Sequence, residues 1–169
     1  RQARSRSAEA HLATRCAVGE RGPFAAAGMG LKPASLSLIT GGRPRRLQPG
    51  PWQGLLVHAL HLIDEIRAHG IDDPYWTFGG GTVLMLRYQH RRSKDIDIFV
   101  PDPQYLGYVS PRLSEVAEAI SADYVEGAGF VKLIRPEGEI DFVASPNLTA
   151  TPFETWSLQR RLVRVETAA

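Results

Sequence analysis

The chain has 169 residues, enough for one folded domain with a hydrophobic core. Its formal net charge of +2 is unevenly distributed. Residues 1–50 carry nine Lys or Arg and two Glu, whereas the remainder carries eleven basic and sixteen acidic residues, a net charge of −5. This acidic remainder excludes a general nucleic-acid coat protein, because such a protein needs excess positive charge in its folded part.

The cysteine content and the hydropathy exclude further classes of protein. Cys16 is the only cysteine, so the chain forms no internal disulfide framework and no cysteine zinc site. No apolar run approaches the ~20 residues that span a bilayer. We therefore expect a cytoplasmic protein without a membrane partner. The chain begins at Arg1, not Met, which indicates a fragment or a processed protein.

Residues 1–50 show little hydrophobic periodicity and are rich in Gly, Pro and Arg. This composition predicts a disordered leader, with one short helix at residues 8–18. The stretch GGRPRRLQPGP at residues 41–51 is typical of a linker. The folded core is expected over residues 51–169.

The first predicted element of the core is an amphipathic helix that begins at Trp52. Apolar residues recur at helical spacing up to Ile66, and Gly70 follows where a helix commonly ends. Residues 75–78 then predict a short strand, the glycines at 79–81 a tight turn, and residues 82–89 a buried helix.

Residues 95–100 predict a strand in which Ile96, Ile98 and Val100 point to one face and Asp95, Asp97 and Phe99 to the other. Residues 101–109 are expected to form a loop. Ser110 and Pro111 then predict the start of a helix. Its expected core stripe is Leu113, Val116, Ala117 and Ile120.

The C-terminal part predicts mainly strands. A short strand is expected at 124–126, followed by a hairpin of 130–135 and 139–144 around the turn Pro136-Glu137-Gly138. A helical turn is expected near 152–159 and a last strand at 162–165. Together these elements predict an α+β fold, a mixed β-sheet with helices packed on it.

The pair Asp95 and Asp97 is the first chemical candidate. Two-residue spacing on a strand puts both carboxylates on one face, where they repel each other unless a positive charge lies between them. A divalent cation satisfies that need, and Mg²⁺ completes its coordination with water and substrate phosphates. The alternative is an ordinary solvated strand face, which is common for such pairs.

Gly79, Gly80, Gly81 and Thr82 follow a predicted strand and open a predicted helix. Free N–H groups at such a turn favour phosphate, and the Thr82 hydroxyl could cap the helix or contact a phosphate oxygen. The alternative is a plain tight turn. The glycine spacing fits neither a Walker loop nor a dinucleotide-binding fingerprint.

A basic cluster lies between the glycines and the aspartates. Its charges could pair with the carboxylates or bind a triphosphate, although most such runs are solvated surface. Ser93 and Lys94 are ranked first because they lie nearest Asp95 in the sequence. The cluster consists of Arg87, Arg91, Arg92, Ser93 and Lys94.

Asp141 is the third candidate carboxylate. It alternates with Ile140 and Phe142, so it projects from the polar face of the second hairpin strand. Catalysis with two metal ions requires carboxylates from adjacent strands. Glu139 shares this face as the competing candidate, with the simpler interpretation of a charge beside a turn.

The stretch GGTVLMLRYQHRRSKDIDIF, which starts at Gly80, resembles the AbiEii/AbiGii nucleotidyltransferase toxins of bacterial abortive-infection and toxin–antitoxin systems. The GlyGly and Asp-x-Asp elements are similar to those of the wider DNA polymerase β-like nucleotidyltransferase superfamily. His90, Arg91 and Ser93 before Asp-Ile-Asp resemble the toxin branch, and Thr82 stands where aminoglycoside-modifying relatives typically carry Trp. The resemblance covers roughly residues 52–167.

The resemblance implies a polymerase β-like core and metal-dependent transfer of a nucleotide from an NTP. The implied acceptor is a hydroxyl of a tRNA 3′ end or of a protein, and a cognate antitoxin is an implied partner. Two Mg²⁺ ions are expected, with Mn²⁺ as the alternative. The implied catalytic and metal-binding residues are Asp95, Asp97 and Asp141, and the implied nucleotide-binding residues are Gly80, Gly81, Thr82, Arg92, Ser93 and Lys94.

Two other functions stay open at this stage. The family's C-terminal helical half has no counterpart here, which favours a truncated domain that binds nucleotide or antitoxin without catalysis. A small-molecule (antibiotic) nucleotidyltransferase is the other alternative. The nucleobase is not specified, although Tyr88 or Phe99 could stack on it.

Overall fold

The structure is a computed structural model that describes residues 37–38 and 45–167. The helix predicted at residues 8–18 and most of the predicted leader lie outside these residues. The helices are α1 (Trp52–Ala68), α2 (Gly80–Tyr88), α3 (Tyr105–Val109) and α4 (Glu115–Ile120). The strands are β1 (Ser37–Leu38), β2 (Arg45–Arg46), β3 (Thr77–Gly79), β4 (Ile96–Val100), β5 (Tyr124–Gly127), β6 (Phe130–Arg135), β7 (Gly138–Ala144), β8 (Phe153–Leu158) and β9 (Arg161–Glu166).

Seven strands form one mixed sheet in the order β5-β6-β7-β4-β3-β9-β8. The pairs β4–β7 and β3–β9 are parallel, and the other neighbours are antiparallel. Strands β1 and β2 pair separately. The expected mixed sheet with packed helices is therefore confirmed.

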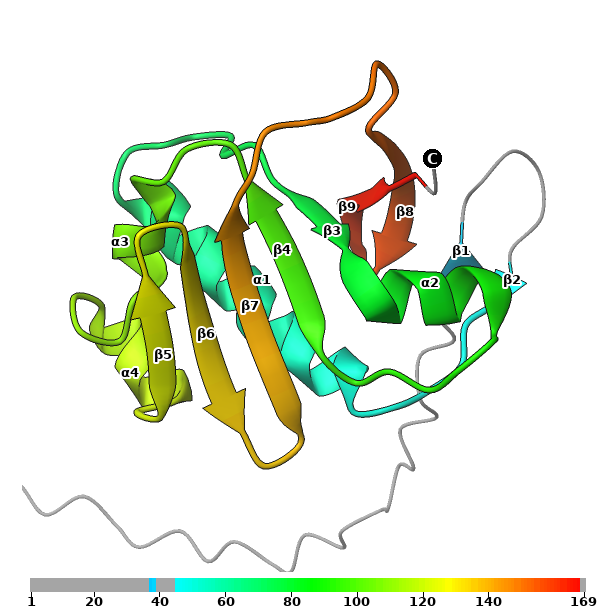
Figure 1. The fold of residues 1–169 in the computed structure, drawn as a ribbon, viewed down its shortest axis with the longest axis horizontal. Coiled ribbons are helices and arrows are strands. Elements are labelled where there is room, and N and C mark those ends of the chain that lie inside the picture. Colours follow the sequence, from blue (N-terminus) through cyan, green and yellow to red (C-terminus); the bar gives the residue numbers. More distant parts are fainter. Residues whose placement is uncertain (1–36, 39–44, 168–169) are drawn as a thin grey trace, which may run out of the picture. The chain divides into compact units, whose positions relative to one another are not determined.

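Helices cover one face of the sheet. In Figure 1, α1, α3 and α4 lie behind β4 to β7, and α1 packs on β4 and β7. Helix α1 forms because its apolar residues recur at helical spacing, and its buried stripe presses on strand residues that point the same way, such as Ile98 and Phe142. In the described part of the chain, no helix covers the opposite face of β4, β6 and β7 (Figure 1).

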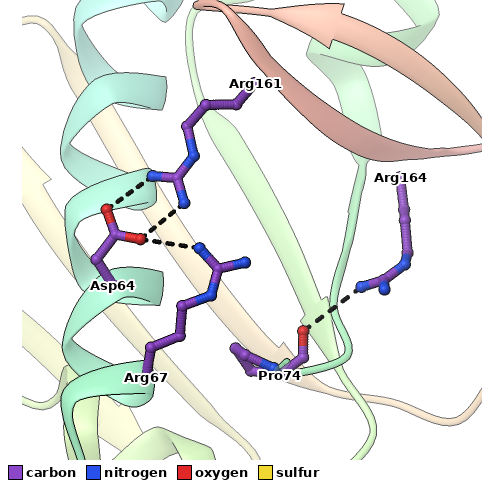
Figure 2. A network of polar contacts seen from close by, with 5 residues as sticks. All are labelled: Asp64, Arg67, Pro74, Arg161 and Arg164. Carbon is purple, nitrogen blue, oxygen red and sulfur yellow. Dashed lines mark hydrogen bonds and ion pairs between the residues drawn. The ribbon is translucent and has the colours of Figure 1, made fainter. Parts of the chain in front are cut away.

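The hairpin of β8 and β9 is connected to α1 by the ion pair of Arg161 with Asp64, shown in Figure 2. Both oxygens of Asp64 accept hydrogen bonds from Arg161 at 2.7 Å, and Arg67 lies 3.0 Å from the same carboxylate. Arg164 donates to the carbonyl of Pro74 at 3.5 Å. These contacts hold β9 beside β3, the strand that leads into the glycine turn.

Residues 101–109 contain a helix, so the predicted loop is wrong. The carboxylate of Asp102 accepts a hydrogen bond from the Gln104 N–H, and α3 follows with Leu106 and Val109 buried. Pro101, Pro103 and Gly107 favour a loop locally. Packing of the two apolar residues against the core overrides that preference.

The helix predicted after Ser110 begins later than expected. Residues 111–113 form a turn, and α4 starts at Glu115 with Ser114 accepting the Ala117 N–H at its N-cap. Only Ala117 of the predicted core stripe is fully buried, and Leu113 is 62% exposed. The stripe was wrong because the helix is too short to carry it.

The helical turn predicted near 152–159 is also wrong, because β8 occupies this segment and buries Trp156. Hairpins with two-residue loops usually have Gly or Asn at the loop positions with positive φ, and these residues predict the hairpin from the sequence. Here Gln159 and Arg160 adopt φ values of 50° and 62°. The usual sequence signal of the hairpin is therefore missing.

The remaining predictions are close to the observed elements. The long first helix, the strand at 124–126 and the hairpin around Pro136 are confirmed with small shifts at their ends. Within residues 45–50 the structure adds Leu47, which is buried in the core. Among the described residues, none of the helices is both long and apolar enough to cross a membrane.

Candidate active site

The candidate site is a row of residues across the uncovered face of the sheet. Gly79 on β3 pairs with Asp97 on β4, and Asp97 pairs with Asp141 on the parallel strand β7. Lys132 on β6 pairs with Asp141 from the other side. Residues paired across neighbouring strands point to the same face. The register therefore brings two of the three predicted aspartates side by side.

The burial of β4 explains why the carboxylate faces outward. Ile96, Ile98 and Val100 are fully buried towards the helices, whereas Asp97 and Phe99 are partly exposed on the opposite face. This confirms the predicted alternation of the strand. A shift of one residue would bury the carboxylate and expose the isoleucines, so the hydrophobic core itself sets the position of Asp97.

The glycine turn wraps around the Asp97 carboxylate. Gly80 has φ +69°, and a Cβ at this position would lie 1.9 Å from Oδ2 of Asp97. Only glycine fits, because the backbone is left-handed and the carboxylate fills the space of a side chain. The backbone of Gly81 donates a hydrogen bond to Asp97. The N-terminus of α2 thus holds this carboxylate.

The electrostatics of the row leave negative charge unbalanced. Burial raises the pKa of Asp97 above its ordinary value, and the charges of Asp141 and Asp95 raise it further. The hydrogen bond from Gly81 acts in the opposite direction. Burial also raises the pKa of Asp141, although contact with Lys132 opposes the shift. A cation beside these carboxylates would relieve the repulsion.

Asp95 lies immediately before β4 and links three elements. Its carboxylate oxygen Oδ1 accepts the Glu139 N–H at 3.0 Å, which connects it to β7. Its carbonyl accepts a hydrogen bond of 2.5 Å from the Thr82 hydroxyl, which connects it to α2. Thr82 is fully buried. Its hydroxyl therefore joins the glycine turn to the start of β4 and does not face solvent.

Lys132 is a site residue that the sequence analysis did not identify. Its ammonium lies 2.5 Å from Oε2 of Glu139 and 3.2 Å from Oδ2 of Asp141. The hydrogen bond to Glu139 is the main cause that raises the pKa of Lys132. The observed turn at 136–137 is one residue shorter than the predicted one, and it places Lys132 directly opposite Asp141.

The predicted basic cluster separates into three places. Arg91 and Ser93 lie over Gly81, where a Cβ would be 2.6 Å from the Arg91 guanidinium and 3.1 Å from the Ser93 hydroxyl. Arg92 and Lys94 line a cavity of about 620 Å³ together with Ser93, Met85 and residues 48–52. The loop therefore folds Arg91 back onto the glycine turn.

Arg87, the remaining member of the basic cluster, contacts other parts of the fold. Its guanidinium forms an ion pair of 2.5 Å with Glu154, stacks over the Trp156 ring at 4.9 Å and donates to the backbone carbonyl of Glu166. These contacts connect α2 to β8 and β9. Arg87 therefore holds the helix on the sheet, and the charge available near the turn comes from the later residues.

Glu166 is a further carboxylate that the sequence analysis missed. Its Oε1 accepts a hydrogen bond of 3.0 Å from Thr77, and its Oε2 would lie 2.5 Å from a Cβ at Gly79. Glu166 and Phe99 also line a cavity of about 330 Å³ with the loop at 145–149. The row of polar groups thus continues past the glycine turn to β9.

Asp95 and Asp97 are the candidate ligands for a divalent cation, with Asp97 in the middle of the row and Asp95 immediately before β4. In the part of the chain that the structure describes, no three His, Cys, Asp or Glu side chains are arranged to hold a metal ion. Asp95 and Asp97 nevertheless supply the hard oxygen donors that Mg²⁺ prefers, and their repulsion contributes to the raised pKa of Asp97. Water and substrate phosphates commonly complete such a coordination shell.

A glycine turn at a helix N-terminus beside paired carboxylates is the arrangement expected of an enzyme that acts on phosphate groups. The chain matches the family model described as "Nucleotidyl transferase AbiEii toxin, Type IV TA system" over residues 61–165, more than half of its length. The protein belongs to this family of nucleotidyltransferase toxins of toxin–antitoxin systems. No curated protein and no solved structure matches the chain significantly.

Proposed function

We propose that the protein transfers a nucleotide from an NTP to an acceptor hydroxyl in a metal-dependent reaction, with the uncovered sheet face as its active site. One observation carries the proposal: Asp97 and Asp141 are paired across parallel strands beside a glycine turn that opens α2. The family membership supports the same reaction class. The polymerase β-like character of the core is part of this proposal.

Each part of the site has a role in the proposed reaction. The triphosphate would bind against Gly80 and Gly81, where Arg91 and Ser93 supply a positive charge and a hydroxyl donor. Arg92 and Lys94 flank this position from the neighbouring cavity. Asp95 and Asp97 would hold Mg²⁺, or alternatively Mn²⁺, on the triphosphate. A bound divalent ion neutralises phosphate charge in such reactions.

The chemical step forms one bond and breaks another. The acceptor oxygen attacks the α-phosphorus, the bond between the α-phosphorus and the bridging oxygen breaks, and pyrophosphate leaves. The proton of the acceptor hydroxyl passes to the carboxylate of Asp141, whose raised pKa suits a general base. The proposed acceptors are a tRNA 3′ end or a protein hydroxyl, and a cognate antitoxin is the proposed partner.

A labelling experiment tests the function. The chain is incubated with each α-labelled NTP, Mg²⁺, and either total tRNA or a cell lysate, beside Asp97→Asn and the exposed control Asp72→Asn. We expect one nucleotide to label one acceptor class, and the label to disappear with Asp97→Asn alone. Equal labelling by Asp97→Asn would overturn the site assignment. Binding of Mg²⁺ and NTP without any labelled acceptor would identify a nucleotide-binding domain.

A further inference from the structure

Lys132 lies at the β6 end of the row, where its positive charge contacts two carboxylates. Its ammonium lies 3.2 Å from Oδ2 of Asp141 and 2.5 Å from Oε2 of Glu139. The side chain of Asp141 is 15% exposed and that of Lys132 is 31% exposed, so this contact is partly shielded from solvent. A charge pair in such a place is screened much less than one on an open surface.

The sheet itself holds the lysine there. Lys132 and Asp141 are directly paired on antiparallel strands, and neighbouring pairs extend from Phe130–Val143 to Arg135–Gly138. Leu133 and Ile140, which are next to them on the two strands, are fully buried on the opposite face. A shift of register would expose these residues. The Lys132 side chain therefore begins beside Asp141 whatever rotamer it adopts.

A pair of metal ions at a phosphoryl-transfer site lies about 3.5–4 Å apart, with carboxylates between them. The ions would need Asp141 in addition to Asp95 and Asp97. Here one oxygen of Asp141 is already in contact with an ammonium group. A second divalent ion at Asp141 would face the like charge of Lys132 at close range. Asp97 is on β4, one strand farther from Lys132 than Asp141, and the ion pairs of Lys132 are with Glu139 and Asp141.

We propose that Lys132 takes the place of a second metal ion, so that the site binds one divalent cation, at Asp95 and Asp97. Lys132 is then a positioning residue: it compensates the charge of Asp141 and Glu139 and orients the Asp141 carboxylate. The inference rests on the proposed function, because it concerns the metal of that site. It replaces the two-ion expectation that followed from family resemblance.

Electron paramagnetic resonance of Mn²⁺ tests the proposal without measuring activity. The chain is titrated with Mn²⁺, alone and with each of the four α,β-methylene nucleoside triphosphates. Two Mn²⁺ ions at the spacing of a two-metal site give an exchange-coupled spectrum, whereas a single ion gives the isolated six-line spectrum. The variants are Lys132→Met, which keeps the length of the side chain without its charge, Lys132→Arg, which keeps the charge, and Asp97→Asn.

The wild-type chain and Lys132→Arg are expected to bind one uncoupled Mn²⁺ per chain. Lys132→Met is expected to bind two, with the coupled spectrum, since Asp141 and Glu139 would then lack their cation. A coupled pair of ions in the wild-type chain would overturn the inference. A single uncoupled ion in Lys132→Met would also overturn it, provided that this variant has the melting temperature of the wild type. The wild-type spectrum decides the question even where a variant does not fold.

The same titration separates failure of the inference from failure of the proposed function. If the wild-type chain binds no Mn²⁺, or if Asp97→Asn leaves Mn²⁺ binding unchanged, the metal site itself is wrong and the proposed function fails with it. If Asp97→Asn abolishes binding of a coupled pair, the metal site is correct and only the role of Lys132 is wrong.

Discussion

Asp97 is the residue at which folding and the proposed chemistry conflict. The carboxylate is partly buried, and two other aspartates add to the repulsion around it. The glycine turn offsets part of this cost through the hydrogen bond from Gly81. Residues with perturbed pKa values in such surroundings are common at active sites, where function takes precedence over stability.

The first prediction follows from the raised pKa of Asp97. Its charged form is less favourable in the folded chain than in the unfolded chain, so ionisation destabilises the fold. This loss is absent below the unfolded pKa and develops as the pH rises to the folded pKa. Asp97→Asn should therefore raise the melting temperature at pH 7 and lose that advantage towards pH 3. Thermal melts in EDTA across this range measure the effect, with Asp72→Asn as the control.

The second prediction concerns Gly80. Alanine at this position would adopt an unfavourable φ of +69° and collide with the Asp97 carboxylate. We expect Gly80→Ala to lower the free energy of unfolding by more than about 1 kcal/mol and to abolish nucleotide transfer. Urea unfolding measures the loss. Gly129→Ala is the matched control, since a Cβ there would meet no atom within 4 Å. Equal effects of the two variants would contradict the role of the turn.

At the scale of elements, the hairpin of β8 and β9 combines firm anchoring with an unfavourable turn. Arg161 and Asp64 hold it to α1, as Figure 2 shows, and Trp156 of β8 is buried. Gln159 and Arg160 both have positive φ at its tip. Tertiary contacts thus stabilise a turn that its own residues disfavour.

The third prediction uses this turn. Substitution of Gln159→Asn together with Arg160→Gly supplies the residues that positive φ angles favour. We expect the free energy of unfolding to rise by about 1 kcal/mol, because a non-glycine residue in a left-handed conformation costs roughly 1–2 kcal/mol. Urea unfolding is the measurement. Arg160→Ala is the control that removes the side chain without relieving φ, and a gain of the same size in that variant would refute the explanation.

At the scale of the whole molecule, the site is assembled from distant parts of the chain. Strand β4 lies between β7 and β3, and β9 lies on the other side of β3. The strand order therefore brings together Gly79, Asp97, Asp141 and Glu166, which are up to 87 residues apart in the sequence. The site therefore forms only when the strands of the sheet have paired.

The fourth prediction is a consequence of that coupling. A ligand that binds only the folded chain stabilises it by mass action, by about 2.7 kcal/mol at 100 times its Kd. We expect the correct NTP with Mg²⁺ to raise the melting temperature of the wild-type chain. Asp97→Asn should abolish the shift, whereas Asp72→Asn should retain it. Identical shifts in both variants would place the nucleotide elsewhere on the molecule.

The sequence by itself determined the elements whose pattern is local. The helical spacing after Trp52 predicted α1, and the alternation in residues 96–100 and 139–144 predicted the face that Asp97 and Asp141 occupy. The motif from Gly80 to Phe99 identified the family. These inferences succeed because side-chain periodicity follows directly from backbone geometry and needs no knowledge of neighbouring strands.

Only the tertiary structure decided which residues from distant parts of the chain contact each other. Glu166 reaches the glycine turn because β9 pairs with β3, and Arg91 lies over Gly81 because the loop folds back. Burial of Leu106 turned a predicted loop into α3, whereas Leu113 stayed exposed. Such contacts depend on strand order and packing, to which residues far apart in the sequence contribute jointly. For that reason no local sequence pattern could predict these contacts.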